Sequence, residues 1–227
     1  MTGPAHSQDH AAERARLVAE IDALYEATRV ETGLAAMSPR VRAAMSKVER
    51  HRLVPAGQRA AAYRNHPLPI GEGQTISQPY IVALSTDLVE PQPHHVVLEV
   101  GTGSGYQAAV LAELVRQVYT IELLASLGRT AAERLAAMGY RNVEVRIGDG
   151  YAGWPERAPF DAIVVTAAAP QVPPALLAQL KPGGRMVIPV GPDGGIQHLL
   201  LITKRDDGSV EERRVLAVRF VPLVPGS

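Results

Sequence analysis

Three glycines at alternate positions form the first feature of the sequence that could bind a ligand. They stand in Leu98-Glu-Val-Gly-Thr-Gly-Ser-Gly-Tyr106, directly after a short apolar run. Glycine lets the chain turn sharply and lets a ligand approach the main chain with no Cβ in the way. The spacing Gly-x-Gly-x-Gly differs from the Gly-x-Gly-x-x-Gly of dinucleotide binders, which favours S-adenosylmethionine over a nicotinamide dinucleotide. The candidate cofactor residues here are Glu99, Gly101, Thr102, Gly103, Ser104 and Gly105.

Two acidic residues further along the chain could complete a nucleoside site. Glu122 ends the second expected strand, where a carboxylate can accept both ribose hydroxyls. Asp149 and Gly150 follow the third expected strand; the Asp can accept from an adenine amine and the Gly150 N–H can donate to a ring nitrogen. The structural alternative for Glu122 is a solvated residue at the end of a strand, and the alternative for Asp149 and Gly150 is a simple turn. Since adjacent parallel strands end at one edge, we expect these segments to share a crevice.

Glu99 and Thr166 are expected to lie near the methionine part of such a ligand. Glu99 could hold its ammonium group, directly or through water, or it could simply brace the glycine turn. Thr166 follows the fourth expected strand and is predicted, with Ala167, to form the floor of the pocket near the reacting methyl group.

Apolar, β-branched runs that alternate with helical segments must position these residues. The strands are predicted at Val96–Val100, Val118–Leu123, Val143–Ile147, Phe160–Thr166 and Arg185–Val190, and the helices at about 105–116, 124–138 and 173–180. Nearly continuous apolar strands joined by helices indicate a parallel sheet covered on both faces. Two further strands, about 197–204 and 211–221, flank Asp207-Gly208, a signal for an antiparallel hairpin. The predicted fold is therefore α/β: a Rossmann-like, doubly wound, mostly parallel sheet with a C-terminal antiparallel hairpin.

The residues before this sheet predict a helical extension. Apolar positions at helical spacing run from Asp9 to about Thr32, where Gly33 ends the helix, and residues 1–8 read as a loose tail. Ser38-Pro39 resembles an N-cap followed by proline at the first helical position. We divide the chain into an N-terminal helical cap with a substrate loop, residues 1–78, and a cofactor-binding core, residues 79–227, together forming one compact unit.

Composition excludes several classes of function. Lys plus Arg and Asp plus Glu both number 23, so no overall positive charge favours nucleic acid or an anionic membrane. The chain has no cysteine, which excludes disulfides and a cysteine nucleophile and fits a reducing compartment. Its seven histidines lack ligand spacing, so no metal site is predicted. No signal peptide or membrane-spanning stretch is recognisable, and we expect a cytoplasmic protein. The oligomeric state stays open.

Several motifs in order make the chain resemble the protein-L-isoaspartate O-methyltransferase family over roughly residues 36–223. They are Pro67-Leu-Pro-Ile-Gly-Glu-Gly-Gln-Thr-Ile-Ser-Gln-Pro-Tyr80, the glycine motif, Gly148-Asp-Gly150, Pro159-Phe-Asp-Ala-Ile-Val-Val-Thr166, Leu180-Lys-Pro-Gly-Gly184 and Val218-Arg-Phe-Val-Pro-Leu223. The first and last of these are the most specific. The chain departs from many relatives at Leu53, where they carry Phe, and at Tyr80, where some carry His.

The resemblance implies an enzyme that transfers a methyl group from S-adenosylmethionine to the free α-carboxylate of L-isoaspartyl residues in damaged proteins and peptides. S-adenosylhomocysteine is the other product. The methyl ester would then close to a succinimide, whose hydrolysis restores normal aspartyl linkages over repeated cycles. No strong base is expected, because the carboxylate is already ionised at neutral pH.

The resemblance also implies the residues that meet the substrate. Ser77 is the predicted catalytic residue, with a hydroxyl that can donate to the carboxylate; the structural alternative is that it only caps the helix expected from Pro79. Thr75, Ile76 and Gln78 would shape the same pocket. The segment Val218, Arg219 and Phe220 would run beside the substrate peptide and bind its main chain; the alternative is a plain core strand.

Three other functions compete with this one. A methyltransferase for a small-molecule or RNA acceptor would share residues 96–190 but would not need the loop at 71–79 or the strand at 218–223. A non-catalytic binding module would bind S-adenosylmethionine without turnover, and Ser77, Glu122 and Asp149 argue against it. The glycine spacing opposes a nicotinamide dehydrogenase.

Overall fold

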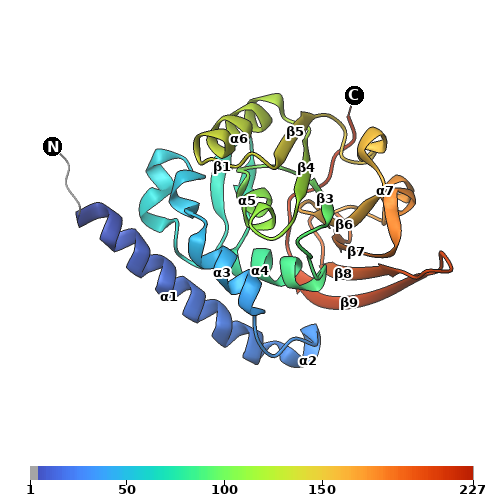
Figure 1. Ribbon diagram of the computed structural model, residues 1–227, viewed down its shortest axis with the longest axis horizontal. Helices are drawn as coiled ribbons and strands as arrows, with labels where there is room; N and C mark the ends of the chain where they lie inside the picture. The colour runs from blue at the N-terminus through green and yellow to red at the C-terminus, as the bar shows by residue number, and fades with distance from the viewer. Residues whose placement is uncertain (1–4, 227) are drawn as a thin grey trace.

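A seven-stranded sheet with the order β5-β4-β3-β6-β7-β8-β9 forms the centre of the molecule (Figure 1). The computed structural model describes residues 5–226, with side chains from residue 10 onward. The strands are β3 (Val96–Val100), β4 (Gln117–Glu122), β5 (Val143–Ile147), β6 (Phe160–Val165), β7 (Leu180–Val190), β8 (Gln197–Lys204) and β9 (Val210–Val218). Strands β3 to β7 pair in parallel, and β8 and β9 add to them antiparallel. The predicted doubly wound α/β fold is confirmed.

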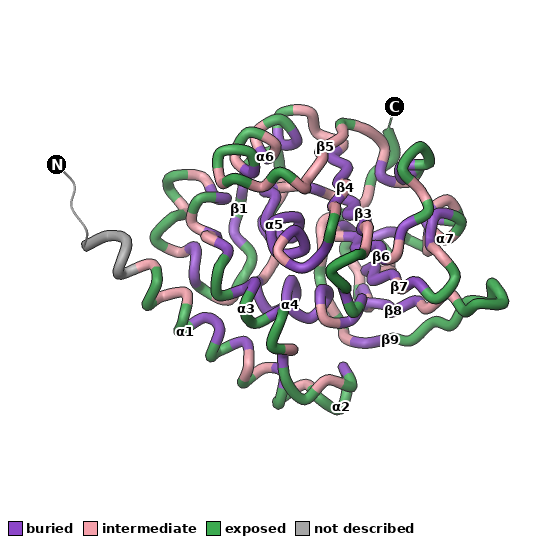
Figure 2. Tube along the Cα trace, in the orientation of Figure 1, coloured by how far each residue is buried: buried purple, intermediate pink, exposed green. Residues whose placement is uncertain are grey.

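Successive residues of the strands point into two different apolar cores, one on each face of the sheet. In β3, Val97 belongs to one core and Leu98 to the other. Helices α4 (Pro79–Leu88), α5 (Tyr106–Ala112) and α6 (Ala125–Ala137) contribute to the first core, and α7 (Pro174–Gln179) to the second. Most residues along β3, β4 and β6 are buried (Figure 2), whereas β5 is only partly buried and most of β9 is exposed. Covering on both faces explains why the central strands are mostly apolar.

The order in which the chain adds strands to the sheet reverses between β3 and β6, which is a topological switch point. From β3 it moves outward through β4 to β5, and then returns to add β6 on the other side of β3. The short helix η3 (Pro155–Arg157) lies on the way back. At such a switch point the connections leave in opposite directions, which opens a crevice at the carboxyl ends of the strands.

An N-terminal set of helices packs across the outside of α4 and α5. It comprises α1 (Ala5–Ala27), α2 (Arg29–Thr32), α3 (Pro39–Lys47), η1 (Arg50–Arg52) and η2 (Ala56–Ala61). The single predicted helix is thus interrupted at Thr28, whereas Gly33 ends α2 in the left-handed conformation as expected. Since α1 already begins at Ala5, the predicted tail is wrong for residues 5–8, and residues 1–4 lie outside the described part. No helix among the described residues could cross a membrane.

The segment predicted as an irregular loop before α4 is a small antiparallel hairpin. Strands β1 (Leu68–Gly71) and β2 (Gln74–Ile76) pair across a tight turn at Glu72 and Gly73. Both turn residues have positive φ, 53° and 70°, as in the turns that match strand twist. Two prolines, Pro67 and Pro69, and two glycines, Gly71 and Gly73, hid this hairpin in the sequence, since both residue types usually mark loops. The hairpin brings the following Ser77 to the edge of the crevice.

Candidate active site

The glycine motif turns sharply between β3 and α5. Gly101 and Gly103 have φ values of 95° and 50°, a region that residues with a Cβ rarely adopt. The turn is fixed from below, because the Gly101 N–H donates to the Ile121 carbonyl over 2.8 Å. It is also fixed from the side by Thr166, whose hydroxyl donates to the Gly101 carbonyl over 2.5 Å. A Cβ at Gly101 would collide with that hydroxyl oxygen, so the close packing requires glycine.

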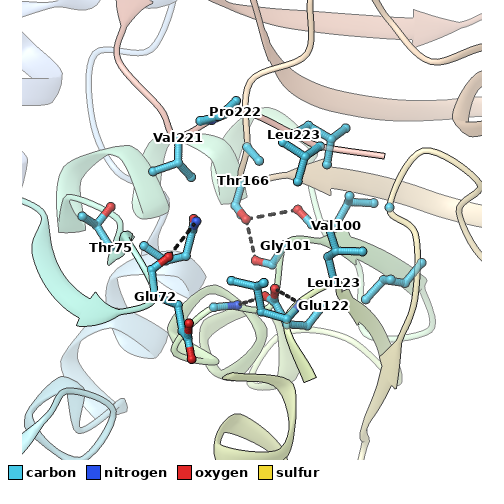
Figure 3. A pocket seen from close by; sticks show the side chains of 17 residues that line it. Glu72, Thr75, Val100, Gly101, Glu122, Leu123, Thr166, Val221, Pro222 and Leu223 are labelled. Atoms are coloured by element: carbon cyan, nitrogen blue, oxygen red, sulfur yellow. Dashed lines mark hydrogen bonds between the residues drawn. The ribbon is translucent and has the colours of Figure 1, made fainter. Parts of the chain in front are cut away.

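An open cavity of about 770 Å³, counting its mouth, lies above this turn. Figure 3 shows Thr166 near the middle of the cavity, with Thr75 and Glu72 of the hairpin on one side and Val221, Pro222 and Leu223 across the top. The carboxyl ends of β3, β4 and β6 therefore form its base, as the switch point predicts. Of the predicted cofactor residues, those that line it are Gly101, Gly103, Glu122, Gly150 and Thr166.

Glu122 presents a carboxylate to the cavity from the end of β4. Its Oε2 accepts from the Gly103 N–H over 2.7 Å, and its Oε1 accepts from the Leu124 N–H over 3.0 Å. Glu122 is absent from the ion pairs formed among the described residues. Each oxygen keeps a free lone pair, so the carboxylate can accept two further hydrogen bonds from a diol.

Asp149 does not line the cavity, although the adjacent Gly150 does. The Asp149 Oδ1 accepts from the Tyr151 N–H over 2.8 Å, which is the local bonding of a turn. Gly226 at the end of the described chain also packs against the Asp149 side chain. The other carboxylate oxygen, Oδ2, accepts no hydrogen bond among the described residues.

A second, smaller cavity joins the glycine turn to the hairpin and contains both Glu99 and Ser77 in its lining. Glu99 is fully buried, and its Oε2 accepts from the Thr120 hydroxyl over 2.6 Å. That hydroxyl also contacts the Thr102 hydroxyl over 2.6 Å, so three side chains form one buried chain of hydrogen bonds. The other oxygen of Glu99, Oε1, has no hydrogen-bond partner among the described residues. An unpartnered buried carboxylate oxygen is costly unless a ligand satisfies it.

Ser77 precedes α4 but does not cap it. The residue at the N-cap position is Gln78, whose side chain makes no capping bond, and Asn65 Oδ1 accepts from the Tyr80 N–H instead. The structural alternative for Ser77 is therefore wrong. No hydrogen bond to the Ser77 hydroxyl occurs among the described residues, which leaves this donor free toward the cavity.

A wide groove runs outward from Ser77 along the C-terminal strand. Thr75 and Thr166 line this groove and both inner cavities, and Ser77 lines the groove and the smaller cavity, so the three spaces adjoin at these side chains. The predicted substrate residues that line it are Thr75, Gln78, Val218, Arg219 and Phe220, whereas Ile76 is buried in the wall of the smaller cavity. The structure thus brings the two halves of the predicted site together at Thr166.

The main chain of Phe220 is held by Gln197. Phe220 N–H donates to Gln197 Oε1 over 2.6 Å, and Gln197 Nε2 donates to the Phe220 carbonyl over 3.1 Å. The Gln197 side chain is almost fully buried, at 2% exposure. A peptide that pairs with the C-terminal strand must therefore use main-chain groups before Phe220. The sequence gives no signal for this clamp.

A model of the family described as Protein-L-isoaspartate(D-aspartate) O-methyltransferase matches residues 23–227. The chain belongs to this family. A protein of Polaromonas sp. named Protein-L-isoaspartate O-methyltransferase 2 is 61% identical over 91% of this chain and 98% of its own length. One of Cupriavidus necator, named Protein-L-isoaspartate O-methyltransferase 1, is 59% identical over 94% of this chain and 83% of its own.

Solved structures of the isoaspartate methyltransferase family have the same fold. One named protein-L-isoaspartate O-methyltransferase is 27% identical, with a TM-score of 0.80 over 92% of this chain and 65% of that chain. A Plasmodium falciparum relative, described in complex with S-adenosyl-L-homocysteine, is 24% identical with a TM-score of 0.76, over 95% of this chain and 98% of that chain. The second likeness supports the fold alone.

The C-terminal wall of the cavity is the part of this family member's site that sequence reasoning missed. Val221 to Val224 line the cavity after the chain has left β9. They are held there because the Leu223 N–H donates to the Ala168 carbonyl over 2.7 Å and the Tyr151 hydroxyl donates to the Leu223 carbonyl over 3.1 Å. The only sequence signal was the terminal Val-Arg-Phe-Val-Pro-Leu motif, which we had assigned to the substrate alone.

The burial of Glu99 predicts a pH-dependent stability. Desolvation raises the pKa of Glu99 from 4.5 to about 8, so its carboxyl stays protonated in the folded protein where it ionises in the unfolded chain. Between those two values the folded state binds more protons, and the free energy of unfolding must fall as the pH rises. We expect the melting temperature of the cofactor-free protein to fall across this window, and Glu99→Gln to remove that part of the slope. Calorimetry that gave parallel pH profiles would contradict this.

Proposed function

We propose that this protein transfers the methyl group of S-adenosylmethionine to the free α-carboxylate of L-isoaspartyl residues in damaged proteins and peptides. The main support, beyond family membership, is that the Ser77 hydroxyl, which lines both the smaller cavity and the outer groove, has no hydrogen-bond partner among the described residues. A donor left free at such a junction suits an anionic acceptor group. The ester would leave the enzyme and close to a succinimide, whose hydrolysis yields normal aspartyl linkages.

The residues of the inner cavities fit S-adenosylmethionine, which supplies an electrophilic methyl group on a sulfonium sulfur when bound. Glu122 would accept from the two ribose hydroxyls, since its carboxylate faces the cavity with lone pairs to spare. Glu99 Oε1, buried without a partner, would accept from the ammonium group, and that cation would favour the ionised carboxylate. Gly101, Gly103 and Gly150 would admit the ligand to the main chain, with Thr102, Ser104 and Gly105 shaping the turn. Asp149 Oδ2 would accept from the adenine amine.

The acceptor carboxylate needs orientation rather than activation. Main-chain carboxyl groups ionise at a pKa of about 3.5, so the nucleophile is already an anion at neutral pH. Ser77 would donate its hydroxyl hydrogen to one carboxylate oxygen and hold the other in line with the methyl group, with Thr166 below. Thr75, Ile76 and Gln78 would close the pocket around it and exclude water. Val218, Arg219 and Phe220 would border the rest of the peptide.

We also propose how the chain divides into functional parts and where in the cell the protein lies. Residues 1–78, the helical cap and its hairpin, would serve the substrate, and residues 79–227 would bind the cofactor. The two parts form one compact unit, because α4 packs against both α1 and α5. We place the protein in the cytoplasm, which fits a chain that has no cysteine.

A pair of peptides tests the proposed activity. One contains an isoaspartyl residue, and its twin has the same sequence with a normal aspartyl linkage. We expect S-adenosylmethionine-dependent methyl transfer to the first peptide and none above background to the second. Tight cofactor binding without methylation of the isoaspartyl peptide would overturn the proposal and leave an enzyme, or a binding module, for another acceptor.

A further inference from the structure

The groove beyond Ser77 is far larger than a carboxylate needs. Its volume is about 2010 Å³, counting the open mouth, and its lining is mainly apolar. The apolar side chains come from four separate elements, namely Leu24 of α1, Tyr80 and Ile81 of α4, Leu216 and Phe220 near the end of β9, and Ile196 before β8. Arg219 supplies the only charge among the lining residues. Such a lining suits an apolar side chain better than a charged one.

The floor of the groove is held rigidly by contacts between α1 and α4. The Tyr80 hydroxyl lies 2.5 Å from the Thr28 hydroxyl, and the Tyr80 ring packs edge-on against Tyr25 at 5.8 Å. Tyr25 in turn donates to Asp87 over 2.7 Å, which ties the far end of α4 to α1. These contacts preorganise the floor of the groove, so a ligand that binds there does not have to order these side chains.

The outer wall of the groove is formed by an exposed apolar residue. Ile196 is 73% exposed, although most isoleucine side chains are buried. It follows Gly194 and Gly195 in the connection between β7 and β8, and all three residues line the groove. A large apolar side chain at the mouth of an apolar groove would be covered by the ligand that enters.

We propose that this groove binds an apolar side chain of a substrate residue one or two positions from the isoaspartyl residue. The inference rests on the proposed function. The groove shares Thr75, Ser77 and Thr166 with the cavity that would hold the reacting carboxylate, which selects the substrate peptide itself as the occupant. An extended peptide advances about 3.3 Å per residue, so side chains one or two positions away lie within reach of the groove. Strand β9 is the edge of the sheet, and its last residues, Leu216 to Val218, line the groove, so such a peptide can run beside them before the clamped Phe220.

A series of isoaspartyl peptides tests this specificity. Each peptide carries Leu, Ala or Lys at one of the two positions before or after the isoaspartyl residue, and kcat/KM is measured for each. At one position we expect Leu to exceed Ala by about tenfold, as burial of its extra methylene and methyl groups predicts, and Lys to be poorest. Equal values at every position would overturn the inference. If no isoaspartyl peptide is methylated, the proposed function itself fails, which is a different result.

Variants of the N-terminal helix locate the groove. Leu24→Ala should reduce the Leu-to-Ala ratio of kcat/KM toward one, whereas Leu24→Met, which keeps an apolar side chain of similar volume, should preserve it. Val30→Ala is the matched control, because Val30 lies in the same N-terminal extension, is 87% exposed and does not line the groove. A Leu24→Ala variant that lost activity equally on all peptides would show that Leu24 only supports the fold and would contradict the assignment.

Discussion

Replacement of Ser77 by alanine is expected to lower kcat for an isoaspartyl peptide by about 10²- to 10³-fold, the usual loss for one positioned hydrogen-bond donor in a dry site. The reason is that the hydroxyl has no partner among the described residues and lines both the inner cavity and the groove. Its removal leaves the fold intact, since the start of α4 is bonded to Asn65 rather than to Ser77. The Kd for S-adenosylmethionine should change little. Steady-state kinetics and calorimetry measure the two quantities separately.

Two further serine variants make this result specific. Ser77→Thr keeps a hydroxyl and should retain part of the activity, because the donor survives although its rotamers are restricted. Ser209→Ala removes a hydroxyl from the exposed turn between β8 and β9, far from the groove, and should have no effect. If Ser77→Ala keeps the kinetics of the original enzyme, Ser77 has no part in the mechanism and the main-chain groups of the hairpin must hold the carboxylate.

The centre of the parallel sheet was predictable because its strands are buried on both faces and are therefore mostly apolar, and β3 was predicted with its observed bounds. The edge strand β5 was also predicted with its observed bounds, although it is only partly buried and carries Glu144 and Arg146 between its apolar residues. Strand β7 begins five residues earlier than predicted, at Leu180. Its first part contains Pro182, Gly183 and Gly184, residues that normally break strands, and the pairing with β6 shifts register there. The local sequence cannot reveal that a segment rich in proline and glycine still pairs with the neighbouring strand β6.

The parts of the site that were not predicted depend on contacts between distant residues. Gln197 binds the main chain of Phe220, and Leu223 is held by Ala168 and Tyr151. Neither contact follows a helical or strand period, so no pattern marks it in advance. The glycine turn and Glu122 were identifiable because their chemistry follows the ends of strands, and strand ends can be read from the sequence.

Loss of the Glu122 carboxylate is the sharpest test of the cofactor side of the site. Glu122→Ala should weaken S-adenosylmethionine binding by about 1.5 to 3 kcal/mol, roughly 10- to 150-fold in Kd, because charge-assisted hydrogen bonds to the ribose hydroxyls are lost. Part of that loss has a second cause. The Gly103 and Leu124 N–H groups lose their acceptor, which loosens the glycine turn beneath the ligand.

Glu122→Gln separates these two causes. Glutamine keeps one oxygen that can accept from the main chain but carries no charge, so its Kd should lie between those of the original enzyme and Glu122→Ala. Glu133→Ala is the matched control, since it removes the same charge from the exposed face of α6, away from the cavity lining. Calorimetry should show its Kd unchanged. If Glu122→Ala bound S-adenosylmethionine as tightly as Glu133→Ala, the ribose would have to lie elsewhere, and the cavity above Gly101 would be left without its main polar anchor. The methyl group could then not be placed beside Ser77 by the route proposed here.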